Sequence, residues 1–386
     1  MRSFLRYFRR LHLWLLVNLA FIAAFFICSV RTDWMTLLAE RVSMPLERAL
    51  GRAWALVPFS GAELCYGLAI ALAVIYLIVS VVRIVRAEYR LEELYRRFIV
   101  AVNVLLSLYV AFCLLWGVNF YAADFCDKSG IYPAPVTQEE LLAVTRYFAE
   151  QTALCADAVP RDETGAYAAP RQESLALGPT LYEPLYDEFP FLRLDVDPAP
   201  KPVYFSTVLS ALDTTGFYCP FTGESSLNMD FPAATFPATV AHELAHRRGI
   251  ASEQQCNFLA VLAATRSDDP AYRYSGWLLG YIHLSNALYG VAPEAWQEIR
   301  TALPAGVDAD LRAANAYWAR YESAVSGASN RAYDAMLKSY GDTLGMRSYG
   351  AVVDLLVAYY GGNLLDTDTV QTAESETEQT VEKTKP

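Results

Sequence analysis

Histidine is scarce in this sequence, with four among 386 residues. Two of them, His242 and His246, stand four positions apart, and Glu243 directly follows the first. At helical spacing both imidazoles project from one face about a turn apart, which is how a helix offers two nitrogens to one metal ion. With so few histidines present, this pattern is improbable by chance. It predicts a Zn2+ site, and a helix with two solvated histidines is the alternative.

The residues around the two histidines predict a helix without reference to a metal. Thr235 is a suitable N-cap, and Pro237 stands in the first turn, where its missing N–H costs no hydrogen bond. Gly249 can end the helix after the second histidine. The motif and its local context therefore agree.

Positive charge is scarce in the later part of the chain. Residues 1–120 carry 13 Lys or Arg against 7 Asp or Glu, whereas residues 121–386 carry 18 against 35. A strongly acidic surface repels nucleic-acid phosphates and other anions. We therefore expect no nucleic-acid partner, and cationic or neutral substrates in preference to anionic ones.

Charged side chains are nearly absent from three runs of membrane-spanning length, residues 13–30, 64–82 and 99–118. No clear small-residue cleavage site follows the first run, which argues against a cleaved signal peptide. Arginines crowd the N-terminus and the short link between the second and third runs, and such clusters are typical of the cytoplasmic side. We expect a multi-pass plasma-membrane protein with a cytoplasmic N-terminus and an extracytoplasmic part after about residue 119. Arginines between the first two runs weaken this topology.

The predicted fold class is α+β and mostly helical, in three parts. A membrane anchor with three transmembrane helices occupies residues 1–120, a zincin-like extracytoplasmic domain 121–365, and a disordered acidic tail 366–386. Aromatic and β-branched residues punctuated by Gly and Pro predict short strands within 202–206 and 216–228. In zincins, an edge strand ahead of the metal helix binds extended peptide through main-chain hydrogen bonds.

Further helices follow from capping and periodicity. Thr137 and Glu140 predict a capping box at the start of one helix, and a second helix is expected from about Gln172 to Phe189. Four cysteines lie in the later part of the chain, so one or two disulfides are possible there, with the pairing open. Their spacing is unlike a zinc ribbon, and we expect no metal ligand among them: Cys126, Cys155, Cys219 and Cys256.

A catalytic zinc needs a third protein ligand and an open position for water. Glu253 is the best candidate, because Gly249 permits a sharp turn and a capping box at Ser252 begins the next helix with Glu253 in its first turn. Glu224 and Asn257 are the competing ligands. The alternative for Glu253 is that it only caps its helix.

The motif also predicts a mechanism of hydrolysis. Zinc lowers the pKa of its bound water, and Glu243 takes the proton as general base and passes it to the leaving amine. During hydrolysis an oxyanion forms on the substrate carbonyl, where zinc holds it. A second group that stabilises this oxyanion is usual. His283 is one candidate and Tyr349, with Arg347, is another; for each, a core or surface role is the alternative.

Several motifs carry a resemblance to known proteins. The run from Glu253 to Asn257 resembles the Glu-x-x-Ala-Asp pattern of membrane gluzincins such as the HtpX-type and CAAX-prenyl proteases, in which that Glu is the third ligand. The link from His246 to Glu253 is shorter than in thermolysin-like enzymes, and Ser252 stands where metzincins have their last histidine.

The whole chain resembles an uncharacterised bacterial family of membrane-anchored, zincin-like proteins grouped with the metallopeptidases. The motifs that carry this resemblance are Trp116-Gly-x-Asn119, Pro220-Phe-Thr-Gly-Glu224-x-x-x-Asn228, the stretch His242 to Phe258, and Gly345-x-x-Ser348-Tyr349-Gly350. The resemblance implies a gluzincin-like architecture and no established substrate.

Two functions follow from these observations. The first is a membrane-anchored zinc metallopeptidase that cuts peptides or proteins outside the cytoplasm, because the general base Glu243 stands intact beside both histidines. The second is a non-hydrolytic receptor or sensor that keeps the zinc fold, binds a cell-envelope ligand and signals through its transmembrane helices.

Overall fold

The computed structural model describes residues 8–340 and 352–362. The predicted tail and the candidates Arg347 and Tyr349 lie outside these residues. The chain divides into two compact units. The first, here called the membrane unit, contains Met1–Asp124, Lys201–Tyr204 and Tyr218–Ser226. The second, here called the helical unit, contains Phe125–Pro200, Phe205–Phe217 and Leu227–Pro386.

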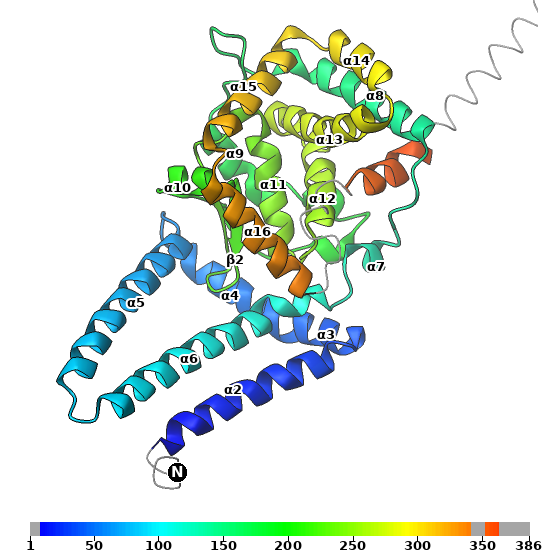
Figure 1. Cartoon of the computed structure of the whole chain (residues 1–386). Coiled ribbons are helices and arrows are strands. Elements are labelled where there is room, and N and C mark those ends of the chain that lie inside the picture. The colour runs from blue at the N-terminus through cyan, green and yellow to red at the C-terminus, as the bar shows by residue number, and fades with distance from the viewer. Residues whose placement is uncertain (1–7, 341–351, 363–386) are drawn as a thin grey trace, which may run out of the picture. The chain divides into compact units, whose positions relative to one another are not determined.

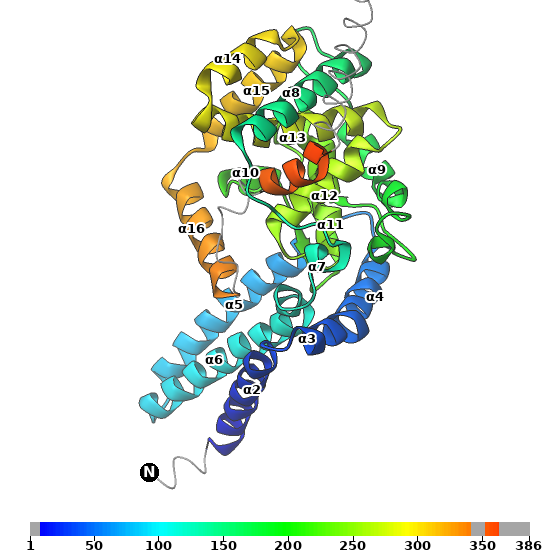
Figure 2. The ribbon, with the colours of Figure 1, turned by 90° about the vertical axis from the view of Figure 1, so that its right-hand side faces the viewer.

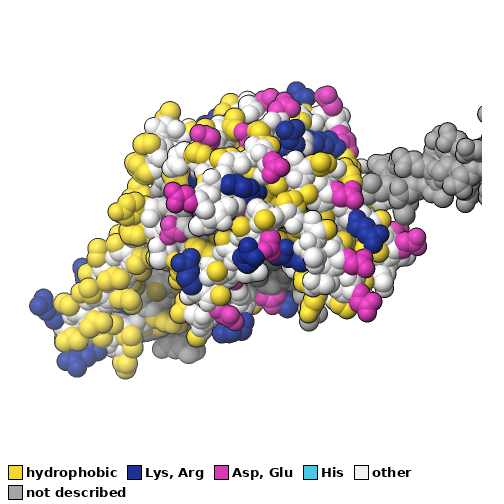
Figure 3. All heavy atoms as spheres, turned by 90° about the horizontal axis from the view of Figure 1, so that it is seen from above, with side chains coloured by type: hydrophobic (Ala, Val, Ile, Leu, Met, Phe, Trp, Pro, Cys, Tyr) yellow, Lys and Arg dark blue, Asp and Glu magenta, His cyan; other side chains and the backbone are white. Residues whose placement is uncertain are grey.

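Three helices of the membrane unit are long and apolar enough to cross a membrane, which confirms the three predicted candidates. They are α2 (Arg9–Cys28), α5 (Gly61–Arg86) and α6 (Arg90–Leu115). Many apolar side chains of these helices are exposed in the isolated chain, as expected for surfaces that face lipid. The hydrophobic side chains at the left of Figure 3 belong to this unit.

Helices α2 and α6 pack side by side (Figure 1) and share buried asparagines. The Asn18 side chain donates to the Asn103 carbonyl oxygen at 3.2 Å, and the Asn103 side chain donates to the Leu11 carbonyl oxygen at 3.1 Å. Polar side chains that bond across transmembrane helices favour one pairing over others, because lipid offers them no alternative partner.

The segment between α2 and α5 is helical. It consists of α3 (Thr32–Leu38), a π-helical turn (Ala39–Ser43) and α4 (Met44–Trp54). Met35 and Ala39 on its inner face are buried against α2 and α6 residues. Trp34 and Leu37 are exposed.

The helical unit contains most of the remaining helices (Figure 2). They are α7 (Phe125–Ser129), α8 (Gln138–Cys155), α9 (Arg171–Leu177), α10 (Ser206–Ala211), α11 (Phe236–Arg247), α12 (Glu253–Thr265), α13 (Pro270–Val291), α14 (Pro293–Ala302), α15 (Ala305–Tyr321), α16 (Ala324–Ser339) and Val352–Gly362. The predicted capping box at the start of α8 is present, with Thr137 and Glu140 bonding each other's backbone N–H.

The predicted helix from Gln172 to Phe189 is wrong. Helix α9 ends at Leu177, and short 3-10 turns follow it at Gly178–Thr180 and Glu183–Leu185. Pro179 and Pro184 stand in these turns. Proline removes a backbone donor and clashes with the preceding helical turn, so an α-helix cannot continue through both positions.

The core of the helical unit is built around α13, which packs against α8, α11 and α12. Helix α12 is buried on nearly all sides. Gly280 of α13 permits close packing, because a Cβ there would lie 2.2 Å from a ring carbon of Phe148 on α8. The position thus requires glycine.

A three-stranded sheet contains β1 (Lys201–Pro202), β2 (Gly216–Cys219) and β3 (Glu224–Leu227), in the order β1-β3-β2. The second predicted strand region, 216–228, contains β2 and β3, whereas only Pro202 of the first, 202–206, lies in a strand, and α10 begins at Ser206. Strand β2 is an edge strand, but β3, the strand directly ahead of α11 in the sequence, is the central one and not the expected edge. All seven cysteines lie in the described residues, and none forms a disulfide.

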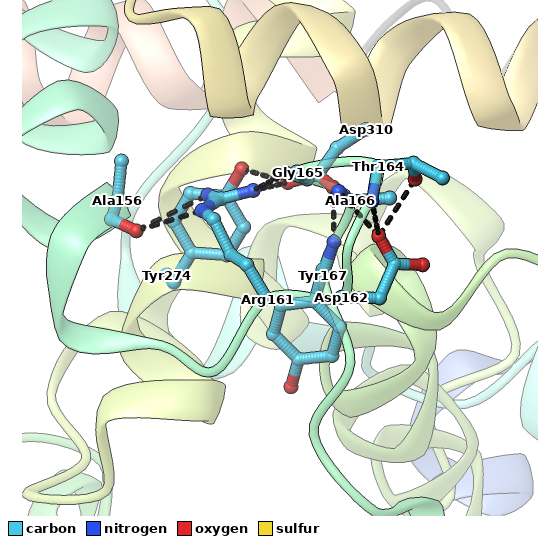
Figure 4. Close-up of polar contacts among 9 residues, drawn as sticks. All are labelled: Ala156, Arg161, Asp162, Thr164, Gly165, Ala166, Tyr167, Tyr274 and Asp310. Carbon is cyan, nitrogen blue, oxygen red and sulfur yellow. Dashed lines mark hydrogen bonds and ion pairs between the residues drawn. The ribbon is translucent and has the colours of Figure 1, made fainter.

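A buried polar network fixes the loop between α8 and α9 (Figure 4). Arg161 donates to the carbonyl oxygen of Gly165 and forms an ion pair with Asp310 of α15 at 3.1 Å. The same Asp310 carboxylate accepts bonds from the Tyr274 hydroxyl of α13 and the Tyr167 backbone N–H. A single carboxylate therefore satisfies three donors, two from this loop and one from α13, and so ties the loop to the core.

Candidate metal centre

Helices α11 and α12 carry the candidate site and pack against each other. His242 and His246 lie one turn apart on α11, with ring centroids separated by 4.9 Å. Pro237 lies in the first turn of α11, and Gly249 after its end has φ of 82°, a left-handed conformation that favours glycine. Thr235 is the N-cap residue as predicted, although its side chain makes no capping bond.

The turn after α11 brings Glu253 back to the histidines. One carboxylate oxygen, Oε2, lies 3.1 Å from Nε2 of His242, and the other, Oε1, lies 3.6 Å from Nε2 of His246. Glu253 is buried. The structure therefore brings together the three side chains that the sequence singles out as metal ligands.

Hydrogen bonds on the far side of each imidazole determine which nitrogen faces Glu253. Nδ1 of His246 lies 2.8 Å from the Ile250 carbonyl oxygen, and Nδ1 of His242 lies 3.0 Å from Oδ1 of Asn257. Both oxygens can only accept, so each neutral imidazole carries its proton on Nδ1. Each Nε2 then presents a lone pair toward the Glu253 carboxylate.

Two lone pairs and a carboxylate at this separation repel one another unless a positive charge lies between them. A proton on His242 supplies such a charge in the metal-free site, and a divalent cation can take its place. Imidazole and carboxylate are ligands that zinc accepts. Hydrogen bonds from ligand histidines to carbonyl oxygens are typical of zinc sites. The donor set therefore fits a zinc ion held by His242, His246 and Glu253.

The pKa shifts follow from burial and from this close contact. Burial would raise the pKa of Glu253, but the two neighbouring histidines and the Tyr333 hydroxyl together lower it to about 2. Burial would lower the pKa of His242, but its bond to Glu253 outweighs burial and raises it. For His246 burial dominates and the pKa is lowered. Glu253 is thus an anion at any physiological pH.

Glu243 lies next to this group and is buried. Burial raises its pKa to about 8, with a small opposing effect from His242 and a reinforcing one from Glu253. Strand β2 passes directly over it, since a Cβ on Gly216 would lie 2.9 Å from its Oε1. A carboxyl group whose pKa lies near neutrality is suited to accept and return a proton.

Cys256 offers a further donor atom near the histidines. Its sulfur, together with one nitrogen of each histidine, forms a group in which all atoms lie within 4.8 Å. The sulfur, however, lies 3.3 Å from Nδ1 of His246, on the side of the ring that bonds the Ile250 carbonyl oxygen. Burial also raises the pKa of the thiol. The sulfur therefore lies on the opposite side of the His246 ring from Nε2 and Glu253.

A family model described as "Protein of unknown function (DUF3810)" matches residues 40–357. The chain belongs to this family. No curated protein and no solved structure matches the chain. The DUF3810 match includes α11, α12 and two of the three candidate membrane helices, and its description assigns no activity.

Within the DUF3810 region, both competing ligands have other partners. Glu224 accepts a hydrogen bond from the Ala62 backbone N–H at 2.9 Å and pairs with Lys201 at 2.5 Å, which places it at the N-terminus of α5. Asn257 bonds Nδ1 of His242 and so positions that ligand. The expected capping box of α12 is absent: the Ser252 side chain makes no capping bond, and the Gln255 side chain accepts from the Phe125 backbone N–H.

Tyr333 of α16 is the site residue that the sequence analysis missed. Its hydroxyl donates a hydrogen bond to Oε1 of Glu253. The two residues are 80 positions apart, and no motif spacing connects them. Tyr333 fixes the orientation of the carboxylate and lowers its pKa.

The two predicted oxyanion donors stay predictions. His283 lies half-buried on α13, and Tyr349 lies outside the described residues. The described part of the site thus contains Glu243 and the three ligand side chains, together with the residues that orient them.

Two buried arginines secure the end of α11 directly after the second histidine. Arg247 donates to Oδ1 of Asp197 at 2.6 Å, and Arg248 donates to Oδ2 of the same residue at 2.7 Å. Arg248 also stacks on the Tyr182 ring and donates to the Leu244 carbonyl oxygen. The bond to Leu244 satisfies one of the last carbonyl groups of α11, and the ion pairs with Asp197 hold the turn that leads to Glu253.

Proposed function

We propose that this protein is a membrane-anchored zinc metallopeptidase that hydrolyses peptide bonds on the extracytoplasmic side. The observation that supports it most directly is the convergence of two Nε2 lone pairs on an anionic carboxylate, with Glu243 beside them. This is the donor set and the general base of a catalytic zinc site.

Each residue of the group has a separate task in the proposed reaction. Zinc, when bound, acts as a Lewis acid and makes water acidic enough to lose a proton near neutral pH. Glu243 accepts that proton and returns it to the leaving amine. Asn257 and the Ile250 carbonyl hold the imidazoles in the required tautomer, and Tyr333 holds Glu253.

A peptide substrate is supported by the position of β2. It is an edge strand of its sheet, and its first residue, Gly216, lies against Glu243. An edge strand can pair with an extended peptide through main-chain hydrogen bonds. Such pairing would place a peptide bond close to the general base.

The proposed location follows from the arginine distribution. Arg83 and Arg86 at the end of α5, and Arg90 at the start of α6, flank the link between two candidate membrane helices. The positive-inside rule places this link and the N-terminus in the cytoplasm. The metal centre then lies outside the cytoplasm, where its substrates are peptides or proteins of the cell envelope.

The decisive experiment compares full-length wild type with Glu243→Gln, and profiles the peptides released by cells that express each. The variant should keep close to one equivalent of zinc and lose cleavage, because the amide cannot accept the proton. A matched control is Glu298→Gln, which changes an exposed glutamate on α14. An unchanged peptide profile in a zinc-loaded Glu243→Gln variant would favour the receptor or sensor function.

A further inference from the structure

Three large apolar side chains of the membrane unit are exposed in the loop before α5 and in the segment after β1. Leu56 is 86% exposed, Phe59 50% and Tyr204 85%. We call these three residues the interfacial cluster. Leu56 and Phe59 lie between α4 and α5, whereas Tyr204 comes from a segment about 140 residues later in the chain.

Specific bonds hold the two segments together. The Lys201 ammonium group donates to the Trp54 carbonyl oxygen at 2.6 Å and to the Phe59 carbonyl oxygen at 3.0 Å. The Tyr204 backbone N–H donates to Oε2 of Glu63 at 2.9 Å. All of these residues belong to the membrane unit. Hydrogen bonds therefore hold residues 201–204 against the first turn of α5 and the loop before it.

This attachment determines the depth of Tyr204 relative to the bilayer. The exposed apolar surface of α5 begins with Leu64 and continues through Tyr66 and Leu68. Because a helix rises about 1.5 Å per residue, Glu63 lies at the edge of the surface that faces hydrocarbon. Aromatic side chains at this level are typical of the membrane–water interface, where the ring meets acyl chains and the hydroxyl meets water.

We propose that the interfacial cluster inserts into the outer boundary of the lipid bilayer and that Tyr204 anchors the segment after β1 there. The occupant of this surface is lipid, because the cluster continues the lipid-facing surface of α5. The buried Lys201 and Glu224 side chains pair at 2.5 Å, so neither of these two charges is uncompensated where the segment meets α5. The inference rests on α5 crossing the membrane and does not depend on the proposed peptidase activity.

Hydroxyl-radical footprinting of the full-length wild-type protein in phosphatidylcholine vesicles tests this inference. The comparison is between Tyr204 and Tyr289 of α13, which is 59% exposed. If no lipid covered Tyr204, its larger exposed fraction in the isolated chain would make it react faster than Tyr289. If lipid covers it, the order reverses and Tyr204 is oxidised several-fold more slowly than Tyr289. Faster oxidation of Tyr204 would refute the proposal.

A second experiment identifies what covers Tyr204. A benzophenone amino acid is placed at position 204 in the full-length chain, with position 289 as the exposed control and Leu72, in the middle of α5, as the lipid-facing reference. Adducts of position 204 with phospholipid, at a yield near that of position 72, are expected. Cross-links to a second copy of the chain or to another protein, without lipid adducts, would overturn it.

Discussion

At the scale of single residues, the candidate site depends on hydrogen bonds made on the outer side of each metal ligand. The Ile250 carbonyl and Asn257 select the tautomers of the two histidines, and Tyr333 holds one oxygen of Glu253. These contacts do not touch the metal position. They determine whether three donor atoms already point to one place before a cation arrives.

Tyr333→Phe should weaken zinc binding about tenfold, because Glu253 loses the bond that orients it. The same bond lowers the pKa of Glu253, so the variant should release zinc at a higher pH than wild type. Competition with a chromophoric chelator across a pH series measures both effects. Tyr289→Phe, an exposed tyrosine on α13, serves as the control. Equal affinities for wild type and Tyr333→Phe would contradict the assigned role.

Glu243 predicts a pH-dependent stability of the metal-free protein. Its pKa is raised from 4.5 to about 8 in the folded state, so its contribution is fully present below pH 4.5 and is lost as the pH rises through about 8. Glu243→Gln removes this loss. With a chelator present, the melting temperature of the variant relative to wild type should therefore rise between about pH 4.5 and about pH 8. A difference in melting temperature between variant and wild type that does not change with pH would show that burial does not perturb the pKa of Glu243.

At the scale of elements, the turn between α11 and α12 brings the third ligand to the first two. Gly249 supplies the left-handed residue that the turn needs, and Asp197 holds the two arginines that follow His246. All three of these charged side chains are buried, with at most 5% of each side chain exposed. The turn is thus part of a rigid core and not a mobile loop.

Asp197→Ala should lower the free energy of unfolding by about 3–5 kcal/mol, because it leaves two buried guanidinium groups without their carboxylate. Urea denaturation of the metal-free protein measures this loss. Asp195→Ala changes an exposed aspartate two positions earlier and should have little effect. A loss under about 1 kcal/mol in Asp197→Ala would mean that water reaches the arginines and replaces the carboxylate.

At the scale of the whole molecule, one zinc ion would join α11 and α12 and, through Tyr333, α16. A ligand that binds only the folded state stabilises it by mass action, by about 4 kcal/mol at a thousandfold excess over its Kd. Zinc should therefore raise the melting temperature of the full-length protein, and a chelator should reverse the rise.

His246→Ala removes one ligand and should abolish this zinc-dependent rise. His283→Ala changes a histidine on another helix and should retain it, so the comparison separates the metal site from a general effect of histidine loss. An equal zinc-dependent rise in both variants would contradict the ligand assignment.

Local sequence patterns determined the helix with the two histidines, the three candidate membrane helices and the position of Glu253. The spacing of His242, Glu243 and His246 places both imidazoles on one helix face, because α-helical geometry is set by neighbouring residues. Apolar runs identified three candidate membrane helices for the same reason, since length and hydrophobicity are local properties. The short link between α11 and α12, which contains Gly249, likewise predicted that Glu253 would lie close to the two histidines.

Long-range packing decided the rest. No spacing rule brings Tyr333 to Glu253, and Glu224, which suits a metal ligand by sequence, instead caps the N-terminus of α5 beside Lys201. Side chains far apart in sequence meet only after the chain has buried its apolar surface, so their contacts are a property of the tertiary structure.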